Sequence, residues 1–228
     1  MRSKTGIFKE VTSTWNVVTR CLHGCIYCWA RRYAKRLSEM GIEPYSTRGF
    51  QPTFIDSRLR KRFPRNSFIF VCDMGDLFGE WVPREWIGRV LDTIKMWTHT
   101  YFLLLTKNPK RYLSLDMPVN SVAGATIESN RDHPSLSKAP SQSERIDSMK
   151  RLAHKNKVMV IEPVLEFDLE EFTEAIREIS PSITYIGYDN YGFRLPEPRL
   201  EKTSKLVDAL KEFTDVRLKT IRKAWYEA

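Results

Sequence analysis

The sequence has few cysteines and no long apolar run: four cysteines occur among its 228 residues. Because a membrane-spanning helix needs about 20 consecutive apolar residues, no membrane partner is expected. The chain starts with basic residues, but no apolar segment follows residues 1–6 to form a signal peptide. Ten glycines and twelve prolines are too few for a collagen-like or low-complexity chain. We therefore expect a globular, cytoplasmic protein.

The distribution of the cysteines excludes a disulfide-stabilised fold. Three of the four lie between Cys21 and Cys28, whereas disulfides join distant segments of secreted chains. In a reducing compartment, such clustering indicates that the thiols bind a metal or a metal cluster.

Acidic residues are outnumbered, since 37 Lys and Arg stand against 28 Asp and Glu, with a net charge of +9 and a pI near 9.4. A surface of this charge attracts polyanions, above all nucleic acid. The basic residues gather in two runs, which are Arg31, Arg32, Lys35 and Arg36, and then Arg58, Arg60, Lys61, Arg62 and Arg65. Such runs are usually solvated faces, and a polyanionic substrate or cofactor is the alternative interpretation.

Five short apolar runs are typical of strands buried in a parallel sheet. They are residues 67–72, 101–105, 121–126, 158–161 and 183–188, and a further strand is expected at about 10–18. Helical spacing, capping residues and a C-terminal glycine predict the helices between them. These helices are expected at residues 29–40, 83–97, 143–154, 168–179 and 201–213.

Strands that alternate with helices in this way predict right-handed βαβ units and a parallel sheet. Six units fit into 228 residues, while a complete eight-unit barrel usually takes about 250. The expected fold is an α/β partial (β/α)6 TIM-type barrel with parallel strands, as a single domain over residues 1–228. The segments 44–65 and 129–143 are long connections, and we interpret 44–65 as a candidate substrate-binding insert.

The most informative feature is the loop 20–29, which contains Cys21-Leu-His-Gly-Cys25-Ile-Tyr-Cys28 with C-x3-C-x2-C spacing. Three thiolates on one loop can hold three corners of a [4Fe-4S] cluster and leave the fourth iron without a protein ligand. An open coordination position is typical of catalytic rather than structural metal sites. Gly24 has no Cβ, so the loop can fold tightly against the cluster.

A structural zinc site is the alternative interpretation of the same residues. Zinc in such sites has four protein ligands, usually in two separated pairs. His23 and Cys72 are available as a fourth ligand, but His23 lies inside the loop and would strain it, and Cys72 ends a strand. The sequence therefore favours a cluster over zinc.

At these cysteines the sequence resembles the radical S-adenosylmethionine (SAM) superfamily, in the spacing, in Tyr27 before the third cysteine and in the position after a first strand. In that superfamily the open iron binds SAM, and reductive cleavage yields a 5′-deoxyadenosyl radical that abstracts hydrogen from a substrate. The resemblance implies a radical SAM enzyme with a [4Fe-4S] cluster and SAM as cofactors. It also implies a low-potential electron donor of the flavodoxin or ferredoxin type, and we expect a monomer or homodimer.

Four further motifs follow in order along the chain: Thr14-Trp-Asn16, Met74-Gly-Asp-Leu-Phe78, Leu105-Thr-Lys-Asn-Pro109 and Ile161-Glu-Pro-Val-Leu165. Together with the cysteines they are similar to a phage- and prokaryote-associated radical SAM family related to spore photoproduct lyase. The similarity extends from about residue 13 to 190. It implies the fold and the cofactors, and it leaves the reaction open.

The resemblance assigns the segment 72–76 to the place of the Gly-Gly-Glu-like motif that holds the methionyl amino group of SAM. The segment reads Cys-Asp-Met-Gly-Asp and departs from that motif. The backbone at Gly75 and the carboxylate of either Asp73 or Asp76 are therefore the expected cofactor contacts.

Further cofactor contacts are implied at other strand ends. Glu128, with Thr126 and Ser129 beside it, lies where the superfamily contacts the ribose and methionyl groups. The backbone of Tyr27 is expected beside the adenine. Lys107 is expected to approach either the carboxylate of SAM or a phosphate of the substrate.

Cys72 and Tyr188 are the candidate catalytic residues. A Cys72 thiol that faces the substrate can return a hydrogen atom to a substrate radical, and the alternative is a small buried residue at a strand end. Tyr188 and Tyr191 are candidate radical relays, although tyrosines at strand ends commonly just pack. One remaining cysteine cannot ligate a second cluster with a full cysteine set, which favours simple hydrogen abstraction.

DNA or RNA is the favoured substrate. Besides the charge, the tryptophans Trp81, Trp86 and Trp97 are interleaved with charged residues and can stack on bases, although a core position is equally compatible. Two alternatives stay open. One is an enzyme acting on a small anionic metabolite or nucleotide, and the other is a non-catalytic binding protein that uses the cluster structurally or for redox.

Overall fold

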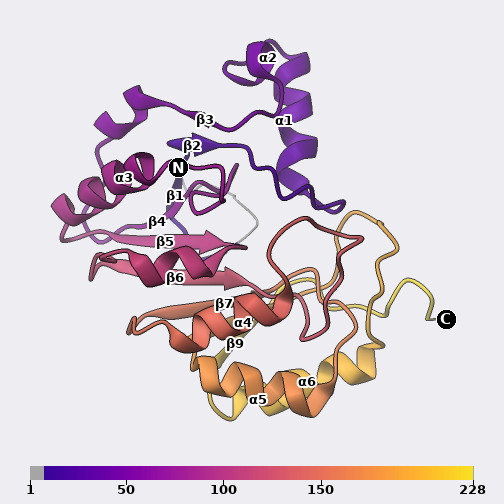
Figure 1. The fold of residues 1–228 in the computed structure, drawn as a ribbon. Coiled ribbons are helices and arrows are strands. Elements are labelled where there is room, and N and C mark those ends of the chain that lie inside the picture. Colours follow the sequence, from indigo (N-terminus) through magenta and orange to yellow (C-terminus); the bar gives the residue numbers. More distant parts are fainter. Residues whose placement is uncertain (1–7, 228) are drawn as a thin grey trace. The chain divides into compact units, whose positions relative to one another are not determined.

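The computed structural model describes residues 8–227, which divide into two compact units (Figure 1). The first unit covers the chain up to Gly24, Cys28–Thr106 and Leu115–Val122. The second covers Cys25–Tyr27, Lys107–Ser114 and the chain from Ala123 onward. The two ends of the expected domain 1–228, including the basic start, lie outside the described residues.

Seven parallel strands form the α/β framework, in the order β1-β4-β5-β6-β7-β8-β9. Their bounds are Ser13–Trp15, Phe68–Val71, Tyr101–Thr106, Ser121–Thr126, Lys157–Ile161, Ile183–Ile186 and Asp215–Leu218. Among the described residues β1 and β9 end this order, so the sheet is open. The predicted α/β class with a partial TIM-type barrel is confirmed, with one strand more than six units supply.

The first unit is built around β1, β4 and β5 in parallel register, with Ile69 opposite Ser13 and Phe102. Helix α3 (Arg84–Met96) follows β4 and buries the apolar stripe Ile87, Val90, Leu91 and Ile94. The helix starts directly after Pro83, whose fixed φ suits the entry to a helix. Trp15 packs edge-on against Phe63 with ring centroids 5.1 Å apart, which joins β1 to the long connection before β4.

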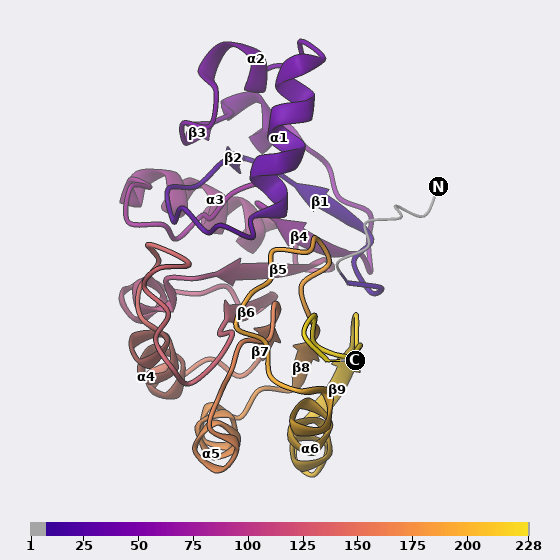
Figure 2. The ribbon, with the colours of Figure 1, turned by 90° about the vertical axis from the view of Figure 1, so that its right-hand side faces the viewer.

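A second part of the first unit contains α1 (Trp29–Glu39), α2 (Tyr45–Arg48) and the short antiparallel pair β2 (Val18–Thr19) and β3 (Thr53–Phe54). Helices α1 and α2 lie next to each other in Figures 1 and 2. The insert 44–65 contains β3 and the 3-10 helix η1 (Asp56–Arg60), and β3 pairs with β2, the strand that leads to Cys21. Its hydrogen bonds include Lys61 Nζ to the Thr14 carbonyl at 2.7 Å.

In the second unit, α4 (Gln142–Arg151), α5 (Leu169–Ile179) and α6 (Leu200–Lys211) lie in a row beside strands β6 to β9, as Figure 2 shows. Helix α4 begins with a capping box in which Ser141 and Glu144 bond each other's backbone N–H. The 3-10 helix η2 (Pro109–Ser114) packs against α4. Tyr112 of η2 is buried and donates its hydroxyl to the Gly124 carbonyl at 3.0 Å.

All five predicted helices are present, with ends within about three residues of the predicted ones. Helix α2 and strands β2, β3 and β9 were not predicted. The first three are only two to four residues long, so no hydrophobic period can develop. Strand β9 reads Asp-Val-Arg-Leu and is largely exposed, as an end strand of the sheet is, so it lacks the apolar run that marks the buried strands.

Within residues 8–227 no helix is both long and apolar enough to cross a membrane.

Candidate functional site

Cys28, the third cysteine of the loop, caps the N-terminus of α1 in the first unit. Its Sγ accepts a hydrogen bond from the backbone N–H of Arg31 at 3.4 Å. The first turn of α1 has no acidic residue, so the partial positive charge of the helix N-terminus is not opposed there. A helix N-terminus stabilises a thiolate, the form in which cysteine binds iron.

The other two cysteines of the motif also keep reduced thiols. Cys21, in the first unit, is half-buried, while Cys25, in the second, is buried with its Sγ 3.1 Å from the hydroxyl of Ser137. None of the four cysteines forms a disulfide. This donor set, three thiols with one at a helix N-terminus, fits an iron–sulfur cluster. Among the described residues, no three His, Cys, Asp or Glu side chains gather closely enough to hold a single metal ion.

The backbone just before Cys21 is fixed by the acidic segment 72–76. Arg20 has a left-handed φ of 72°, and its N–H donates to the Met74 carbonyl at 2.5 Å. Gly75 pairs with Arg20 in an isolated parallel bridge, and a Cβ on Gly75 would lie 2.9 Å from the Arg20 carbonyl oxygen. Glycine is therefore required at position 75 because the Arg20 backbone lies against it.

The side chain of Arg20 is fully buried and holds the insert. Its guanidinium donates to the carbonyls of Pro44, Arg48 and Gln51 and to the hydroxyl of Thr53, and no carboxylate pairs with it among these contacts. Burial lowers the pKa of Arg20, because desolvation disfavours the charged form. Carbonyl dipoles supply the compensation that a buried cation needs. The residue before the first cysteine thus ties the insert to the cysteine loop.

His23, between the first two cysteines, is turned toward Asp76. Its Nε2 lies 2.8 Å from Asp76 Oδ2, and both side chains are buried. Thr106, at the end of β5, donates its hydroxyl to the same carboxylate at 2.7 Å, and the Phe78 N–H donates to it at 2.9 Å. Trp81 packs edge-on against the imidazole with ring centroids 4.8 Å apart. These contacts use both oxygens of Asp76 to anchor the loop.

Asp73 is more exposed than Asp76. It is half-buried, and Asn16 Nδ2 donates to its Oδ1 at 2.5 Å. Burial raises the pKa of its carboxyl, while the Asn16 hydrogen bond lowers it. Of the two candidate carboxylates, Asp73 is the one with a partly exposed group that can accept an outside donor.

Cys72 lies between β4 and these acids and is only 2% exposed. Its Sγ accepts from the Val18 N–H at 3.4 Å, and its φ of 58° is in the left-handed region. Burial raises the pKa of the thiol to about 12, so it stays protonated at neutral pH. The thiol is thus packed inside the first unit.

In the second unit, the carboxylate of Glu128 is the centre of a buried polar cluster. Its Oε1 accepts from the Tyr27 hydroxyl at 2.7 Å and from Lys107. Its Oε2 accepts from Gln142 Nε2 at 2.8 Å and Arg145 Nη1 at 2.7 Å. Glu128 is fully buried, so its four donors satisfy it internally. Two cations against one carboxylate leave the cluster with a net positive charge.

Lys107 is the member of this cluster closest to solvent, with a side chain 16% exposed. Its Nζ lies 5.2 Å from the centroid of the Tyr27 ring. The two other predicted residues of this region are engaged locally. The Thr126 carbonyl accepts from Arg145 at 3.0 Å, and the Ser129 hydroxyl donates to the Glu166 carbonyl at 2.6 Å.

Tyr188, the second candidate catalytic residue, is fully buried in the second unit. Its hydroxyl lies 2.7 Å from Thr203 Oγ1 and donates to the Pro198 carbonyl at 3.1 Å. The Arg222 guanidinium lies 5.0 Å from its ring centroid. Burial raises the pKa of the phenol to about 12, so it stays neutral.

Sequence reasoning missed Arg20, Gln142 and Arg145, and it missed the anchoring role of His23. Gln142 and Arg145 lie on the same face of α4 as the buried Met149, at helical spacing, which was the available signal. Arg20 carries no such signal. The tryptophans considered for base stacking are half-buried in the first unit, with Trp86 packed on Phe54 and Trp97 on Phe63.

Comparison with known proteins gives a family and a set of structural neighbours. The family model described as "Protein of unknown function (DUF5131)" matches residues 5–177. No curated protein matches the chain. A spore photoproduct lyase variant is similar in structure, with a TM-score of 0.61 and 9% identity, over 97% of this chain and 81% of that chain.

Two further solved structures are similar at about the same level. One is spore photoproduct lyase complexed with dinucleoside spore photoproduct, with a TM-score of 0.55 and 11% identity, over 93% of this chain and 66% of that one. The other is a variant of that enzyme with bound AdoMet and the dinucleoside, with a TM-score of 0.56 and 12% identity, over the same 93% and 66%. At these identities the likeness shows a shared fold.

Proposed function

The chain belongs to the DUF5131 family of proteins of unknown function, and we propose that it is a radical SAM enzyme that abstracts a hydrogen atom from a nucleic-acid substrate. The observation that carries this proposal is the C-x3-C-x2-C loop with its third thiol at the N-terminus of α1. The fold shared with spore photoproduct lyase, a radical SAM enzyme, supports it.

The three loop cysteines are the residues that would hold a [4Fe-4S] cluster. With one electron from an external low-potential donor, a bound cluster would supply the reductive cleavage of SAM to methionine and a 5′-deoxyadenosyl radical, the group that would abstract hydrogen from the substrate. Asp76 and Thr106 orient the loop through His23, and Arg20 fixes the backbone before Cys21. These residues act as positioning residues, because the protein's own groups bond the Asp76 carboxylate, the Thr106 hydroxyl and the Nη atoms of Arg20.

We assign the binding of the methionyl amino group of SAM to Asp73 rather than to Asp76. An ammonium group needs an acceptor that it can reach, and the Asp73 carboxyl is partly exposed, whereas Asp76 is buried with both oxygens bonded by His23, Thr106 and the Phe78 N–H. We assign the binding of an anionic group to Lys107, because the Glu128 carboxylate neutralises only one of the two cations, Lys107 and Arg145, that contact it. No step is assigned to Cys72 or Tyr188, because both are buried with their polar atoms bonded internally.

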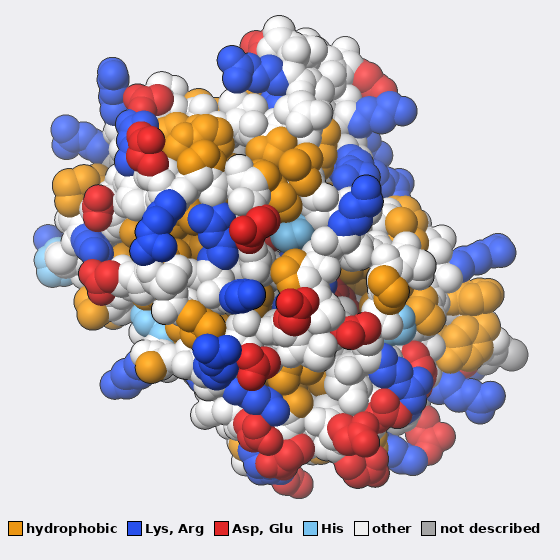
Figure 3. Space-filling model, in the orientation of Figure 1, with side chains coloured by type: hydrophobic (Ala, Val, Ile, Leu, Met, Phe, Trp, Pro, Cys, Tyr) orange, Lys and Arg blue, Asp and Glu red, His pale blue; other side chains and the backbone are white. Residues whose placement is uncertain are grey.

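The distribution of charge supports a nucleic-acid substrate. The first unit contains 17 Lys and Arg and 10 Asp and Glu, a net +7, whereas the second contains 20 and 18, a net +2. Residues 29–65 alone carry ten basic and three acidic residues, and most of the basic ones are exposed. On the face drawn in Figure 3, Lys and Arg side chains are spread over the surface, while Asp and Glu side chains are densest at its lower end. A solved structure of spore photoproduct lyase is a complex with dinucleoside spore photoproduct, which also supports this substrate class.

The test is anaerobic reconstitution with iron and sulfide, reduction with dithionite in the presence of SAM, and chromatography for 5′-deoxyadenosine. We expect 5′-deoxyadenosine from the wild-type protein, none from Cys25→Ala, and an undiminished yield from Cys72→Ala, the matched control outside the motif. An intact cluster that yields no 5′-deoxyadenosine, with or without added DNA or RNA, would contradict the proposal. Zinc in place of iron in protein purified without oxygen would contradict it as well.

A further inference from the structure

Three exposed aromatic rings occur in the second unit near the end of β8 and in the C-terminal segment. Trp225 is 51% exposed, Tyr191 49% and Tyr226 47%. The Trp225 and Tyr226 rings contact each other edge-on, with centroids 5.5 Å apart. The guanidinium of Arg194 lies 5.7 Å from the Trp225 ring centroid. We call Arg194, Trp225 and Tyr226 the Trp225 surface.

The rings of Trp225 and Tyr226 are fixed by hydrogen bonds at their polar edges. Trp225 Nε1 donates to the Leu195 carbonyl at 2.8 Å, and the Tyr226 hydroxyl donates to the Glu197 carbonyl at 2.8 Å. Glu197 is 2% exposed, and Arg222 holds its carboxylate with two hydrogen bonds of 2.7 and 2.9 Å. The protein thus satisfies the polar edges of the rings while about half of each side chain stays in solvent. A preorganised aromatic surface loses little entropy when it binds a ligand.

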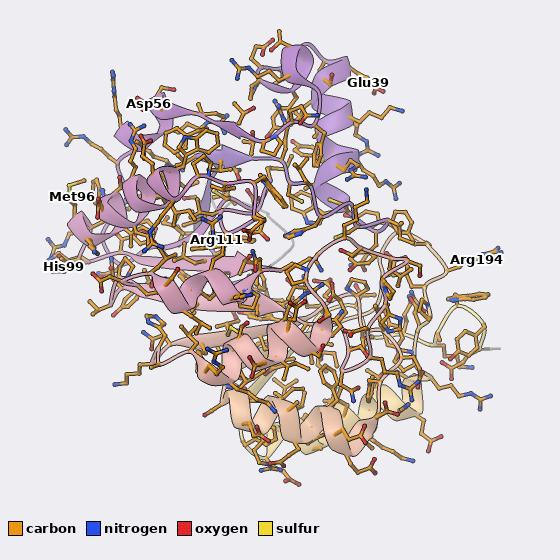
Figure 4. The ribbon with its side chains drawn as sticks, viewed as in Figure 1. Glu39, Asp56, Met96, His99, Arg111 and Arg194 are labelled. Atoms are coloured by element: carbon orange, nitrogen blue, oxygen red, sulfur yellow. The ribbon has the colours of Figure 1, made fainter. Side chains whose placement is uncertain are left out.

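The turn that carries Arg194 is also fixed. The Asp189 carboxylate accepts from the N–H groups of Tyr191 and Phe193 at 3.1 and 2.7 Å. Gly192 and Arg194 have left-handed φ values of 72° and 51°. Such a φ is unfavourable for an arginine, so the turn holds Arg194 where an unconstrained chain would not. In Figure 4 the labelled Arg194 lies at the right-hand edge and points away from the ribbon.

Arg194 is the cation of this surface. Arg194 is exposed, and the structure gives it no acidic partner among residues 8–227. The nearest carboxylates in sequence are committed, Asp189 to the turn and Glu197 to Arg222. The right-hand edge of Figure 3 shows hydrophobic side chains with Lys or Arg side chains above and below them. An aromatic face beside a cation that has no acidic partner complements a base and its phosphate.

We propose that the Trp225 surface binds single-stranded nucleic acid, with an unpaired base stacked on the Trp225 indole and a phosphate at Arg194. In a duplex the faces of the bases are covered by stacked neighbours, so an exposed indole can stack only on an unpaired base. This inference rests on the proposed nucleic-acid substrate and adds the strand type and the place where the strand lies.

The test is fluorescence anisotropy of a labelled 12-nucleotide oligothymidylate, titrated with the reconstituted holoprotein without oxygen at low salt. We expect Trp225→Leu to raise the Kd about 5- to 150-fold, the value of one base–aromatic stack. Trp225→Phe, which keeps an aromatic face, should stay within a few-fold of wild type. Tyr101→Leu is the matched control, because Tyr101 is 55% exposed on β5, in the first unit. It should bind like wild type.

A second arm uses Arg194→Met and a range of salt concentrations. Loss of one phosphate contact lowers the slope of log K against log salt by roughly 0.7 for a single strand. A Trp225→Leu protein that binds like wild type would overturn the proposal, and so would a loss of equal size in Tyr101→Leu or a duplex that binds as tightly as the single strand.

The outcome is separable from that of the proposed function. No binding by the wild-type protein at low salt would overturn this inference and the choice of substrate. The assay for 5′-deoxyadenosine, run without nucleic acid, would still decide the radical SAM chemistry.

Discussion

The polar cluster around Glu128 gives the sharpest prediction of stability. Arg145 is 3% exposed and Glu128 is fully buried, and the two are joined at 2.7 Å. Arg145→Met keeps the length and apolar stem of the side chain but leaves the buried carboxylate with one cation, Lys107, and it frees the acceptors Thr126 O and Pro140 O. Breaking a buried pair by removing one partner costs about 3–5 kcal/mol.

Lys107, Tyr27 and Gln142 remain on Glu128 after this change, so the lower end of that range, about 3 kcal/mol, is expected. For a chain of this length a loss of about 3 kcal/mol lowers the Tm by about 6–12 °C. The measurement is thermal and urea unfolding followed by far-UV circular dichroism.

A double-mutant cycle separates the charge from the packing. Glu128→Gln is nearly isosteric and removes the carboxylate that Arg145 compensates. Arg145→Met alone leaves the Glu128 carboxylate partly uncompensated, but the double variant has no carboxylate there. The two losses in free energy of unfolding should therefore not add, and we expect an interaction energy of about 2 kcal/mol. Losses that add within about 0.5 kcal/mol would refute the reasoning, because they would mean that the two side chains do not compensate each other.

Three further predictions concern the first unit. Burial raises the pKa of the Cys72 thiol to about 12 in the folded protein, whereas the unfolded thiol ionises near pH 9. Its contribution to the free energy of unfolding is therefore fully present below pH 9 and falls by about 1.4 kcal/mol per pH unit above it. Unfolding of wild type and Cys72→Ala between pH 8 and 10.5 should show this difference in slope. Asp73→Asn should raise the Kd for SAM at least tenfold in isothermal titration, with little change in iron content. Asp76→Asn weakens the His23 anchor and should lower the iron bound per chain. Equal effects of the two variants would contradict their separate roles. Gly75→Ala forces a Cβ within 2.9 Å of the Arg20 carbonyl and should lower the Tm by several degrees, and an unchanged Tm would show that the backbone there can yield.

The parts of the molecule that the sequence predicts are those with a local signal. The helices α3 and α5 carry continuous apolar stripes with start signals, and their ends fall within one residue of the prediction. The strands buried on both faces are marked by apolar runs, as at β6, whose bounds match. Strand β9 has no such run because it is exposed, and the strand β3 exists through its pairing with β2.

The candidate site shows the same division. The three loop cysteines lie within a segment of eight residues, so their spacing alone indicates a shared cluster. The choice between Asp73 and Asp76 depends on His23, which is 53 positions from Asp76, and on Thr106, 30 positions away. No pattern in the sequence predicts that two such distant residues use up one carboxylate. The sequence therefore supplied the candidates, and our proposed choice between them rests on tertiary packing.

Arg20 is the clearest case in which sequence reasoning fails for a physical reason. A lone arginine before a cysteine motif is normally a solvated charge, yet this one is fully buried and faces carbonyl groups. Burying a cation without a carboxylate is costly, and an apolar residue of similar size is often as stable or more stable at such a position. What an apolar residue cannot do is donate several hydrogen bonds in a fixed fork, and lysine, a point charge, cannot do so either. The Arg20 guanidinium selects one conformation of residues 44–53. The Arg20 backbone N–H, which donates to the Met74 carbonyl, selects one conformation of the chain at Cys21. We infer that this arginine provides conformational specificity beside the cysteine loop. Arg20→Met should therefore lower the iron bound per chain. Arg20→Lys should lower it as well, because lysine cannot form the same fork of hydrogen bonds.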